Sequence, residues 1–303
     1  MSADIDLHAS TLLELVQAVE QRLDGADLAY GHGTDNARDE AAWLVLEALG
    51  HSPVEPVEDV YAPVSADDLV AVRELLVRRI TTRQPLAYLT GRAWFAGLAF
   101  RVDERVLVPR SPLAEMIAQR FAPWLRAGNV TRILDIGTGS GCIAVACACA
   151  FPEAVVDATD IDPEALALAR ENVAAHGLGE RVQLRQADVY AGLEGERYDL
   201  IVANPPYVDS ERMAALPAEY RHEPAAALAG GDRGCDIVDR ILAGAAAHLT
   251  PDGLLVVETG GSGATVEAQW PDLPLIWPEL ASGDAGIFVL DAPALSRRTD
   301  RAV

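Results

Sequence analysis

Cysteine is scarce in this sequence of 303 residues, and its four cysteines form no metal-binding or disulfide pattern. Cys142, Cys147 and Cys149 lie in one small apolar run, Cys235 stands alone, and no C-x-x-C pair occurs. We therefore expect neither a metal site nor a disulfide framework. The spacing indicates small hydrophobic residues that pack along a helix.

Long hydrophobic runs are also missing. No stretch approaches the roughly 20 uninterrupted apolar residues that a membrane span needs. The first ten residues, MSADIDLHAS, are acidic and polar and lack the features of a secretory signal. We therefore expect a cytoplasmic protein that does not associate with a membrane. Half of the residues are hydrophobic, which is enough for the core of one large domain and a smaller one.

Basic residues are few. The chain has 24 of them against 46 acidic residues, and its net charge is −22. Binding to a phosphate backbone depends on clustered Lys and Arg, so we expect no direct binding to nucleic acid. Two interpretations of the acidity stay open: it serves solubility, for example in a salt-adapted host, or it attracts a basic protein partner.

The pattern of apolar residues changes twice along the chain and predicts three regions. Residues 1–92 are typical of helices, one of which begins after Ser65 with apolar residues at spacings of three and four. Residues 93–112 predict a linking β-hairpin. In residues 113–303 strands and helices alternate, which predicts an α/β domain with a mostly parallel sheet. Its expected strands are 132–136, 154–159, 182–185, 199–203, 254–258 and 286–290, and its first helix is expected at 113–124.

A glycine-rich loop follows the first expected strand of the third region. The loop opens a helix, and its residues are Gly137, Thr138, Gly139, Ser140 and Gly141. Glycines let the backbone approach a ligand closely, and the free N–H groups at a helix start carry positive partial charge. Such a loop suits a carboxylate and a phosphate equally well.

Acidic residues at strand ends favour an amino-acid nucleotide ligand. Asp135 is expected to end its strand, where it can receive an amino group. Asp160 ends the second strand and suits two ribose hydroxyls, and Asp188 follows the third and suits an adenine amino group. A phosphate-binding loop would need G-K-[ST], and no lysine is present. A single aspartate is often only a helix cap, as we expect for Asp162 before Pro163.

This set of residues resembles the class I S-adenosylmethionine-dependent methyltransferases over about Leu113 to Leu290. The resemblance implies a Rossmann-like, mostly parallel sheet of seven strands. It also implies S-adenosyl-L-methionine as cofactor, S-adenosyl-L-homocysteine as product, and no metal. The expected cofactor-binding residues are Asp135, Gly137, Thr138, Gly139, Ser140, Gly141, Asp160, Ile161, Asp188, Val189 and Asn204.

The tetrapeptide Asn204-Pro205-Pro206-Tyr207 directly follows the expected strand at 199–203. An amide or aromatic amine nitrogen is a poor nucleophile, because its lone pair is delocalised. The Asn204 side-chain oxygen and the Pro205 carbonyl can accept its two N–H groups, and Pro206 helps to keep the loop rigid. Tyr207 offers a flat face to the planar group. We therefore expect these four residues to be catalytic in methyl transfer to nitrogen.

Several further motifs resemble the HemK-type protein glutamine N5-methyltransferases, and together they cover the chain from about Tyr30 to Leu290. They are D-I-G-T-G-S-G at 135–141, N-P-P-Y at 204–207, E-Y-R-H-E-P at 219–224, Gly230-Gly231, P-L-A-Y-L-T at 85–90 and V-P-R at 108–110. The resemblance implies an N-terminal helical substrate-recognition domain at 1–92, a hairpin linker at 93–112 and a catalytic domain at 113–303.

The family has two bacterial branches, which act on peptide release factors or on the third large-subunit ribosomal protein. Release-factor enzymes usually carry P-R-P-x-T-E where this chain has P-R-S-P-L-A-E at 109–115. The segments 30–36 and 102–108 are similar to the ribosomal-protein branch. The resemblance therefore implies methylation of the N5 amide nitrogen of a glutamine in that basic ribosomal protein.

Three alternatives remain: a release-factor substrate, adenine N6-methylation of nucleic acid, and a non-catalytic ligand-binding protein. These functions do not explain two further features of the sequence. The segment Val208 to Gly234 is long for a simple connection, and we interpret it as a mobile substrate lid. For His32 we expect a solvated turn, with a direct role in substrate binding as the alternative.

Overall fold

The computed structural model describes residues 5–281, 283 and 286–299. The chain divides into two compact units. The first, which we call the helical unit, comprises Met1–Glu104, Val108–Arg110 and Pro217–Glu223. The second, the sheet unit, comprises Arg105–Leu107, Ser111–Leu216 and Pro224–Val303. In the described part of the chain, no helix is both long and apolar enough to cross a membrane.

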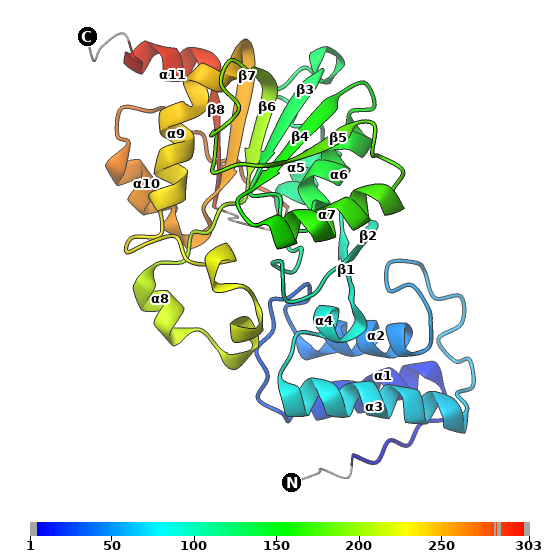
Figure 1. Ribbon diagram of the computed structural model, residues 1–303. Helices are drawn as coiled ribbons and strands as arrows, with labels where there is room; N and C mark the ends of the chain where they lie inside the picture. The colour runs from blue at the N-terminus through cyan, green and yellow to red at the C-terminus, as the bar shows by residue number, and fades with distance from the viewer. Residues whose placement is uncertain (1–4, 282, 284–285, 300–303) are drawn as a thin grey trace. The chain divides into compact units, whose positions relative to one another are not determined.

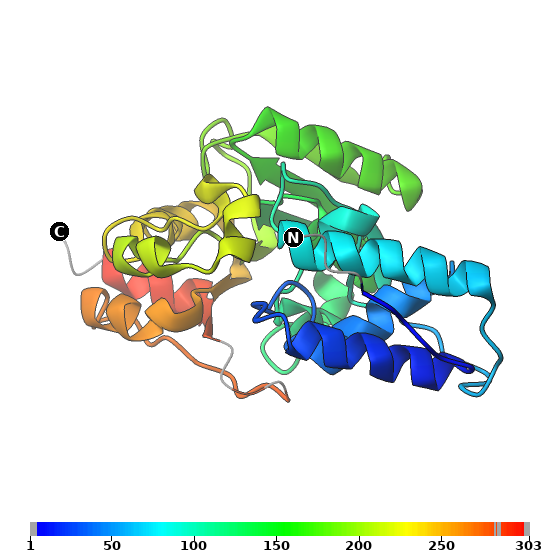
Figure 2. The same cartoon turned by 90° about the horizontal axis from the view of Figure 1, so that it is seen from below.

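In the helical unit, the first three helices begin at polar caps, namely Thr11, Asn36 and Ser65. Its helices are α1 (Leu12–Asp24), α2 (Ala37–Ala48), α3 (Ala66–Thr82) and α4 (Leu86–Thr90), and Figure 2 shows the first three (blue to cyan) from below. Ser65 and Asp68 form the capping box that starts α3, which confirms the predicted start of this helix. The short strands β1 (Arg92–Phe95) and β2 (Leu98–Arg101) form an antiparallel hairpin.

The sheet unit contains strands in the order β5-β4-β3-β6-β7-β8, and all neighbours are parallel except β7 and β8. The strands are β3 (Arg132–Ile136), β4 (Val155–Asp160), β5 (Val182–Gln186), β6 (Tyr198–Ala203), β7 (Leu249–Glu258) and β8 (Ile287–Asp291). Its helices are α5 (Leu113–Ala118), α6 (Cys142–Ala150), α7 (Pro163–Ala175), α8 (Ser210–Ala215), α9 (Asp236–His248), α10 (Gly263–Gln269) and α11 (Ala292–Thr299). This α/β architecture with a mostly parallel sheet confirms the predicted fold class (Figure 1).

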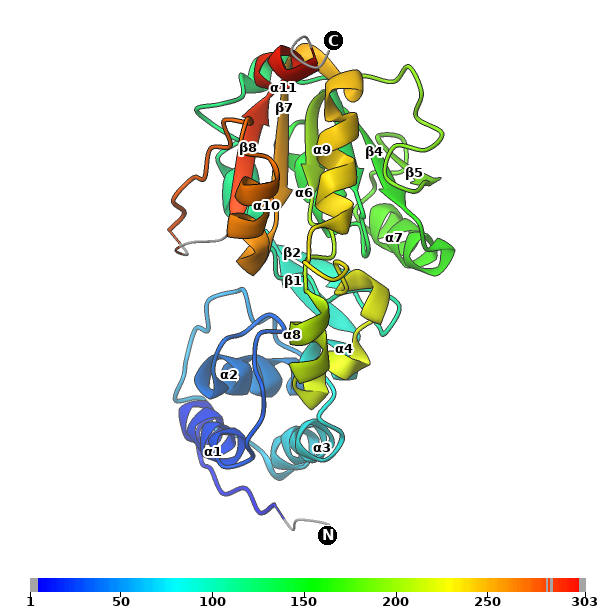
Figure 3. The same ribbon diagram turned by 90° about the vertical axis from the view of Figure 1, so that its left-hand side faces the viewer.

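Alternate residues of the central strands form one apolar layer, because successive side chains of a strand point to opposite faces. Leu134, Ile201, Leu255 and Phe288 belong to this layer and are buried in the same core cluster as residues of α9 and α10. Figure 3 shows α9 and α10 on the same side of the sheet unit. Asp160 at the end of β4 and the loops that follow β3 and β6 lie at the carboxyl edge of the sheet.

The described part of the sheet has six strands, so the expectation of seven is wrong. The segment beside β8 forms only an isolated bridge, between Ile276 and Val289. Pro271, Pro274 and Pro278 surround this position. Proline cannot donate a backbone hydrogen bond to a neighbouring strand. The segment therefore lies beside β8 without forming a strand.

The first helix of the sheet unit is shorter than predicted. Helix α5 ends at Ala118, whereas the apolar pattern suggested a helix as far as position 124. Arg120 and Phe121 adopt the left-handed conformation, with φ of 51° and 56°. This turn buries the Phe121 side chain completely, and the apolar residues after Ala118 therefore pack as a turn.

Candidate active site

The glycine loop leaves β3 with a backbone that only glycine adopts easily. Gly137, Gly139 and Gly141 have φ of 72°, 53° and 81°. A Cβ atom added to Gly137 or Gly139 would meet nothing within 4 Å, whereas one on Gly141 would lie 3.3 Å from the Ala169 Cβ. The first two glycines therefore border open space that a ligand can enter, and Gly141 packs against α7.

The Asp135 side chain organises this loop from beneath. It is completely buried and stands one residue before the end of β3, so the expectation that it ends the strand is off by one position. Its Oδ2 accepts hydrogen bonds from the Thr138 hydroxyl (2.6 Å) and the Ala144 backbone N–H (3.1 Å). Burial raises the pKa of Asp135 to about 7, although both hydrogen bonds act in the opposite direction.

One oxygen of Asp135 is left over. Among the described residues, its Oδ1 has no hydrogen-bond partner. A buried acceptor without a donor costs free energy, which a ligand donor such as an ammonium group would recover. The orphaned oxygen and the open space at Gly137 and Gly139 therefore fit a ligand that carries an amino group.

Asp160 lies at the end of β4, as predicted, and connects to the glycine loop. Its Oδ2 accepts from the Gly139 N–H (2.9 Å) and its Oδ1 from the Asp162 N–H (3.0 Å). Burial raises the pKa of Asp160, while these hydrogen bonds lower it. Ile161 follows with 61 % of its side chain exposed, and it offers an apolar face beside the carboxylate.

Asp188 and Val189 follow β5 in a turn, and Val189 has a φ of 58°. The Asp188 carboxylate forms an ion pair with Arg240 of α9 at 2.8 Å, and this hydrogen bond lowers the pKa of Asp188. Both partners are about half exposed, so the ion pair is accessible to a competing donor.

Ser140 is buried, and its carbonyl accepts from the Asn172 amide (2.8 Å), which anchors the loop to α7.

The tetrapeptide at 204–207 lies at the same sheet edge as the glycine loop. In the register of the sheet, Ile136 of β3 pairs with Ala203 of β6. The next residue along each strand is therefore Gly137 on one side and Asn204 on the other. Because β3 and β6 are parallel neighbours, the two loops leave the sheet side by side.

Tyr207 is held by residues that sequence analysis missed. Its hydroxyl donates to Oε1 of Glu258 (2.9 Å), and the Ser111 hydroxyl donates to Oε2 of the same carboxylate (2.5 Å). The Ser262 hydroxyl donates to the Tyr207 carbonyl (2.9 Å). Glu258 is buried at the end of β7, as Asp160 is at the end of β4, so the same strand-end signal was present in the sequence.

Close backbone contacts complete the support of this loop. A Cβ on Gly230 would lie 2.7 Å from the Tyr207 Cα, and one on Gly260 would lie 2.5 Å from the tyrosine ring. Both distances are shorter than carbon atoms tolerate. Glycine is therefore required at these two positions for the loop to take this shape.

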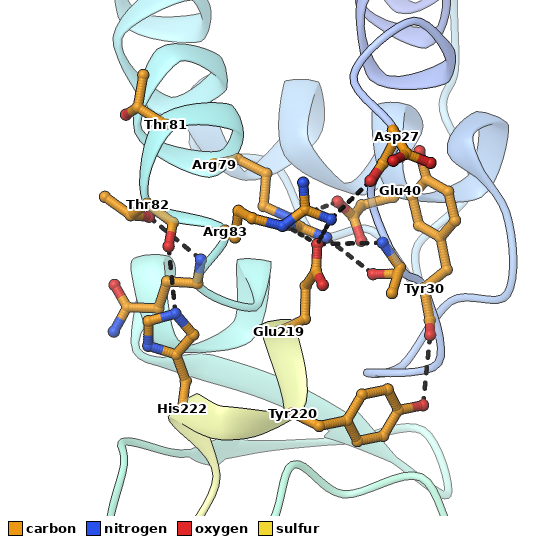
Figure 4. A network of polar contacts seen from close by, with 12 residues as sticks. Asp27, Tyr30, Glu40, Arg79, Thr81, Thr82, Arg83, Glu219, Tyr220 and His222 are labelled. Carbon is orange, nitrogen blue, oxygen red and sulfur yellow. Dashed lines mark hydrogen bonds and ion pairs between the residues drawn. The ribbon is translucent and has the colours of Figure 1, made fainter. Parts of the chain in front are cut away.

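The segment after the tetrapeptide is not a mobile lid over its whole length. Residues 217–223 belong to the helical unit, and Figure 4 shows three of them, Glu219, Tyr220 and His222. The Glu219 carboxylate is completely buried, forms an ion pair with Arg83 (2.7 Å) and accepts from the Ala29 N–H (3.1 Å). Arg79, which is also completely buried, lies 3.9 Å from Glu219 and donates to Glu40 (2.7 Å). The lid interpretation is wrong for these residues, because buried ion pairs fix them.

His32 is likewise not in a solvated turn. Only 3 % of it is exposed, and its ring packs on Tyr220 with ring centroids 4.3 Å apart. Its Nε2 lies 3.4 Å from the Glu223 carboxylate, which also receives two hydrogen bonds from Arg110 (2.5 and 2.8 Å). Sequence could not reveal this position, because Glu223 comes from a segment almost 200 residues away.

The fold and the paired loops at its strand ends define a class I methyltransferase. The Methyltransferase small domain family matches residues 116–220, and the PrmC N-terminal domain family matches residues 14–91. A solved structure of the hMettl16 catalytic domain in complex with MAT2A 3'UTR hairpin 6 shares this fold. Its TM-score is 0.50 at 18 % sequence identity, over 75 % of this chain and 81 % of that one.

Sequence comparison narrows this class to one family. The chain is 48 % identical to a ribosomal protein uL3 glutamine methyltransferase of Bordetella pertussis, over 94 % of this chain and 96 % of the relative. It is 46 % identical to the protein of the same description from Burkholderia pseudomallei, over 94 % and 95 %. The chain belongs to the family of ribosomal protein uL3 glutamine methyltransferases.

Proposed function

We propose that this chain transfers the methyl group of S-adenosyl-L-methionine to the N5 amide nitrogen of a glutamine in ribosomal protein uL3. The observation that carries the proposal is the register of β3 and β6, which brings the glycine loop and the tetrapeptide out of the sheet side by side. One loop suits a nucleotide-linked amino acid and the other suits a planar amide. The identity of the substrate is inferred from the relatives named above, which are uL3 glutamine methyltransferases.

The cofactor-binding part of the proposal assigns roles to the first loop. Asp135 Oδ1 accepts the cofactor ammonium group, and the loop 137–141 borders its amino-acid portion. Asp160 accepts the ribose hydroxyls, while Ile161 and Val189 pack on the adenine and Asp188 accepts its amino group. The orphaned oxygen of Asp135 and the exposed face of Ile161 support these assignments.

The tetrapeptide binds and orients the substrate amide. Asn204 Oδ1 and the Pro205 carbonyl accept its two N–H groups, so that the nitrogen lone pair points toward the electrophile, and Pro206 and Tyr207 border the amide plane. The bound cofactor supplies an activated methyl group, whose bond to sulfur breaks as the bond to nitrogen forms. The amide nitrogen then loses one proton to water. Alignment of this kind can supply roughly 7–11 kcal/mol of the barrier.

The acidic charge supports a ribosomal-protein substrate. Ribosomal proteins are basic, and a net charge of −22 accelerates the encounter with a partner of opposite charge. A uL3 substrate also supports a cytoplasmic location. No feature of the site favours a release factor or a nucleic acid over uL3.

The test compares substrates directly. Purified uL3, release factors and total RNA are incubated with the chain and methyl-labelled S-adenosylmethionine, and labelled peptides are identified by mass analysis. We expect label on one glutamine of uL3 only. The control variant Asn204→Ala should lose more than about 100-fold in kcat, with a much smaller loss of affinity for S-adenosylmethionine. Label in a release factor or in RNA, without label in uL3, would overturn the proposal.

A further inference from the structure

We infer that residues 54–61 and the cavity beside them form a docking surface for a basic, partly apolar segment of the protein substrate. The inference rests on the proposed function and adds to it a second contact with the substrate, in the helical unit. The family resemblance implies substrate recognition by residues 1–92 in general, but neither it nor the methyl-transfer site assigns a role to residues 54–61 or to this cavity.

The first observation is a concentration of exposed apolar side chains. Val54, Val57, Val60 and Tyr61 are exposed by 49, 40, 39 and 69 %. They account for four of the seven large apolar side chains that are exposed in the described part of the chain. A single exposed valine needs no explanation, but four within eight residues indicate an interaction surface.

The backbone of this segment is held in place although its side chains face outward. The carbonyls of Val60 and Ala62 accept from the N–H groups of Leu13 (2.9 Å) and Leu12 (3.0 Å), which begin α1. Before the segment, the His51 N–H donates to the Leu46 carbonyl (2.8 Å) at the end of α2. A surface that is already ordered loses little conformational entropy when a partner binds.

A cavity adjoins the apolar segment. It has a volume of about 310 Å³ and is lined by both Trp43 and Trp94, by Pro53, by Val54 of the segment, and by Asp39. Two indole rings and a carboxylate suit a long side chain with a cationic end, because the rings bind its apolar stem and also attract the charge. An arginine or lysine of the partner is therefore the group that this cavity fits.

Charge decides the class of partner. Glu55, Glu58 and Asp59 alternate with the exposed valines. Residues 1–104 contain 18 acidic residues and 8 arginines. Nucleic acid is repelled by such a surface, and so is a second copy of a chain whose net charge is −22. A basic protein segment is attracted, and its apolar residues can cover the valines.

The test changes the charge of the surface and measures methyl transfer to full-length unmethylated uL3 and to a short peptide around the target glutamine. The double variant Glu55→Lys/Glu58→Lys should raise KM for uL3 about tenfold at low salt and leave kcat unchanged. The peptide should be methylated as before, because it lacks the basic segment of uL3 that we assign to the surface. The increase in KM should disappear at high salt, where charges are screened.

Matched controls separate local from general effects. Glu153→Lys/Glu180→Lys makes the same change in net charge at exposed positions of the sheet unit and should alter KM less than about twofold. Val54→Ser/Val57→Ser should raise KM for uL3 at high salt as well, whereas Val70→Ser, which is 53 % exposed on α3, should not.

Equal changes in KM in the surface and control variants, or equal changes in KM for uL3 and for the peptide, would contradict the docking surface. Either result would leave the proposed function intact. Failure of the proposed function has a different signature. In that case the unaltered chain transfers no methyl group to uL3 or to the peptide, and both proposals fall.

Discussion

The buried carboxylates of the helical unit differ from Asp135 at the glycine loop of the sheet unit, although Asp157 on β4 of the same sheet is paired with Arg132. In the helical unit, Glu40, Glu219 and Glu223 each face an arginine. In the sheet unit, Asp135 is held only by the neutral donors Thr138 and Ala144 and keeps one oxygen without a partner. A buried charge that is paired joins parts of the chain, and one that is left unpaired is available to a ligand. Four predictions test this difference, in order of decreasing expected effect.

The largest effect is expected from breaking a pair in the helical unit. Glu219→Ala leaves Arg79 without one of its two carboxylates and should lower the free energy of unfolding by about 3–5 kcal/mol. Hydrogen exchange of α2 and α3 in the full chain measures this loss. Glu211→Ala, an exposed residue of α8, should change stability by less than about 1 kcal/mol. A loss at position 219 as small as that of the control would show that the pair does not join the segment to the unit.

The second prediction concerns pH. Burial alone would raise the pKa of Glu223, but His32 and Arg110 outweigh it and hold the pKa at about 2. A lowered carboxyl pKa stabilises the fold above the ordinary value of 4.5, and this contribution is lost as pH falls toward 2. Glu223→Gln should therefore cost about 3 kcal/mol near neutral pH and progressively less below pH 4.5. Urea unfolding over this pH range would contradict the prediction if the difference stayed constant.

The third prediction addresses the unpaired carboxylate. Asp135→Asn keeps the size of the side chain but removes the charge that we assign to the cofactor ammonium group. Affinity for S-adenosylmethionine should fall about 100-fold, equivalent to about 2.7 kcal/mol. Because burial raises the pKa of Asp135 to about 7, binding to the unaltered chain should also weaken as pH falls below 7. Calorimetry should find no such pH dependence in the variant, and a parallel dependence would count against the assignment.

The smallest effect is expected at Tyr207. Tyr207→Phe removes the hydrogen bond to Glu258 but keeps the ring, and it should lower kcat about 3- to 10-fold with an unchanged KM for S-adenosylmethionine. Because Glu258 acts through Tyr207, Glu258→Gln should lower kcat little further in the Tyr207→Phe background. Additive losses in this double-mutant cycle would refute it.

Features that depend on neighbours in sequence could be predicted. The cap at Ser65, the glycine loop, Asp160 at its strand end and Asp162 before Pro163 all follow from local patterns, and the structure has each of them. The seventh strand was expected from resemblance and is absent from the described residues, because prolines interrupt the segment around Ile276. Local chemistry there opposes a strand, although the family pattern favours one.

Features that join distant segments could not be predicted. His32 seemed solvated because its neighbours are glycines and polar residues, yet Tyr220 and Glu223 bury it. Glu219 belongs to a segment that sequence alone suggests is mobile, yet Arg83 fixes it. In both cases the partner is more than 100 residues away, and no periodicity in the sequence records such a pairing.

Most helices and strands of the two units, and the loops that carry the chemistry, follow from the sequence, because caps, glycines and apolar periodicity act over a few residues. Which loops become neighbours and which charges are paired depends on the tertiary fold. The register between β3 and β6 places Asn204 beside the glycine loop. Burial of Glu219 beside Arg79 and Arg83 attaches residues 217–223 to the helical unit. The strand register and the buried ion pairs both depend on packing between distant parts of the chain. Such packing sets the free energy gained by burying apolar surface and by pairing charges.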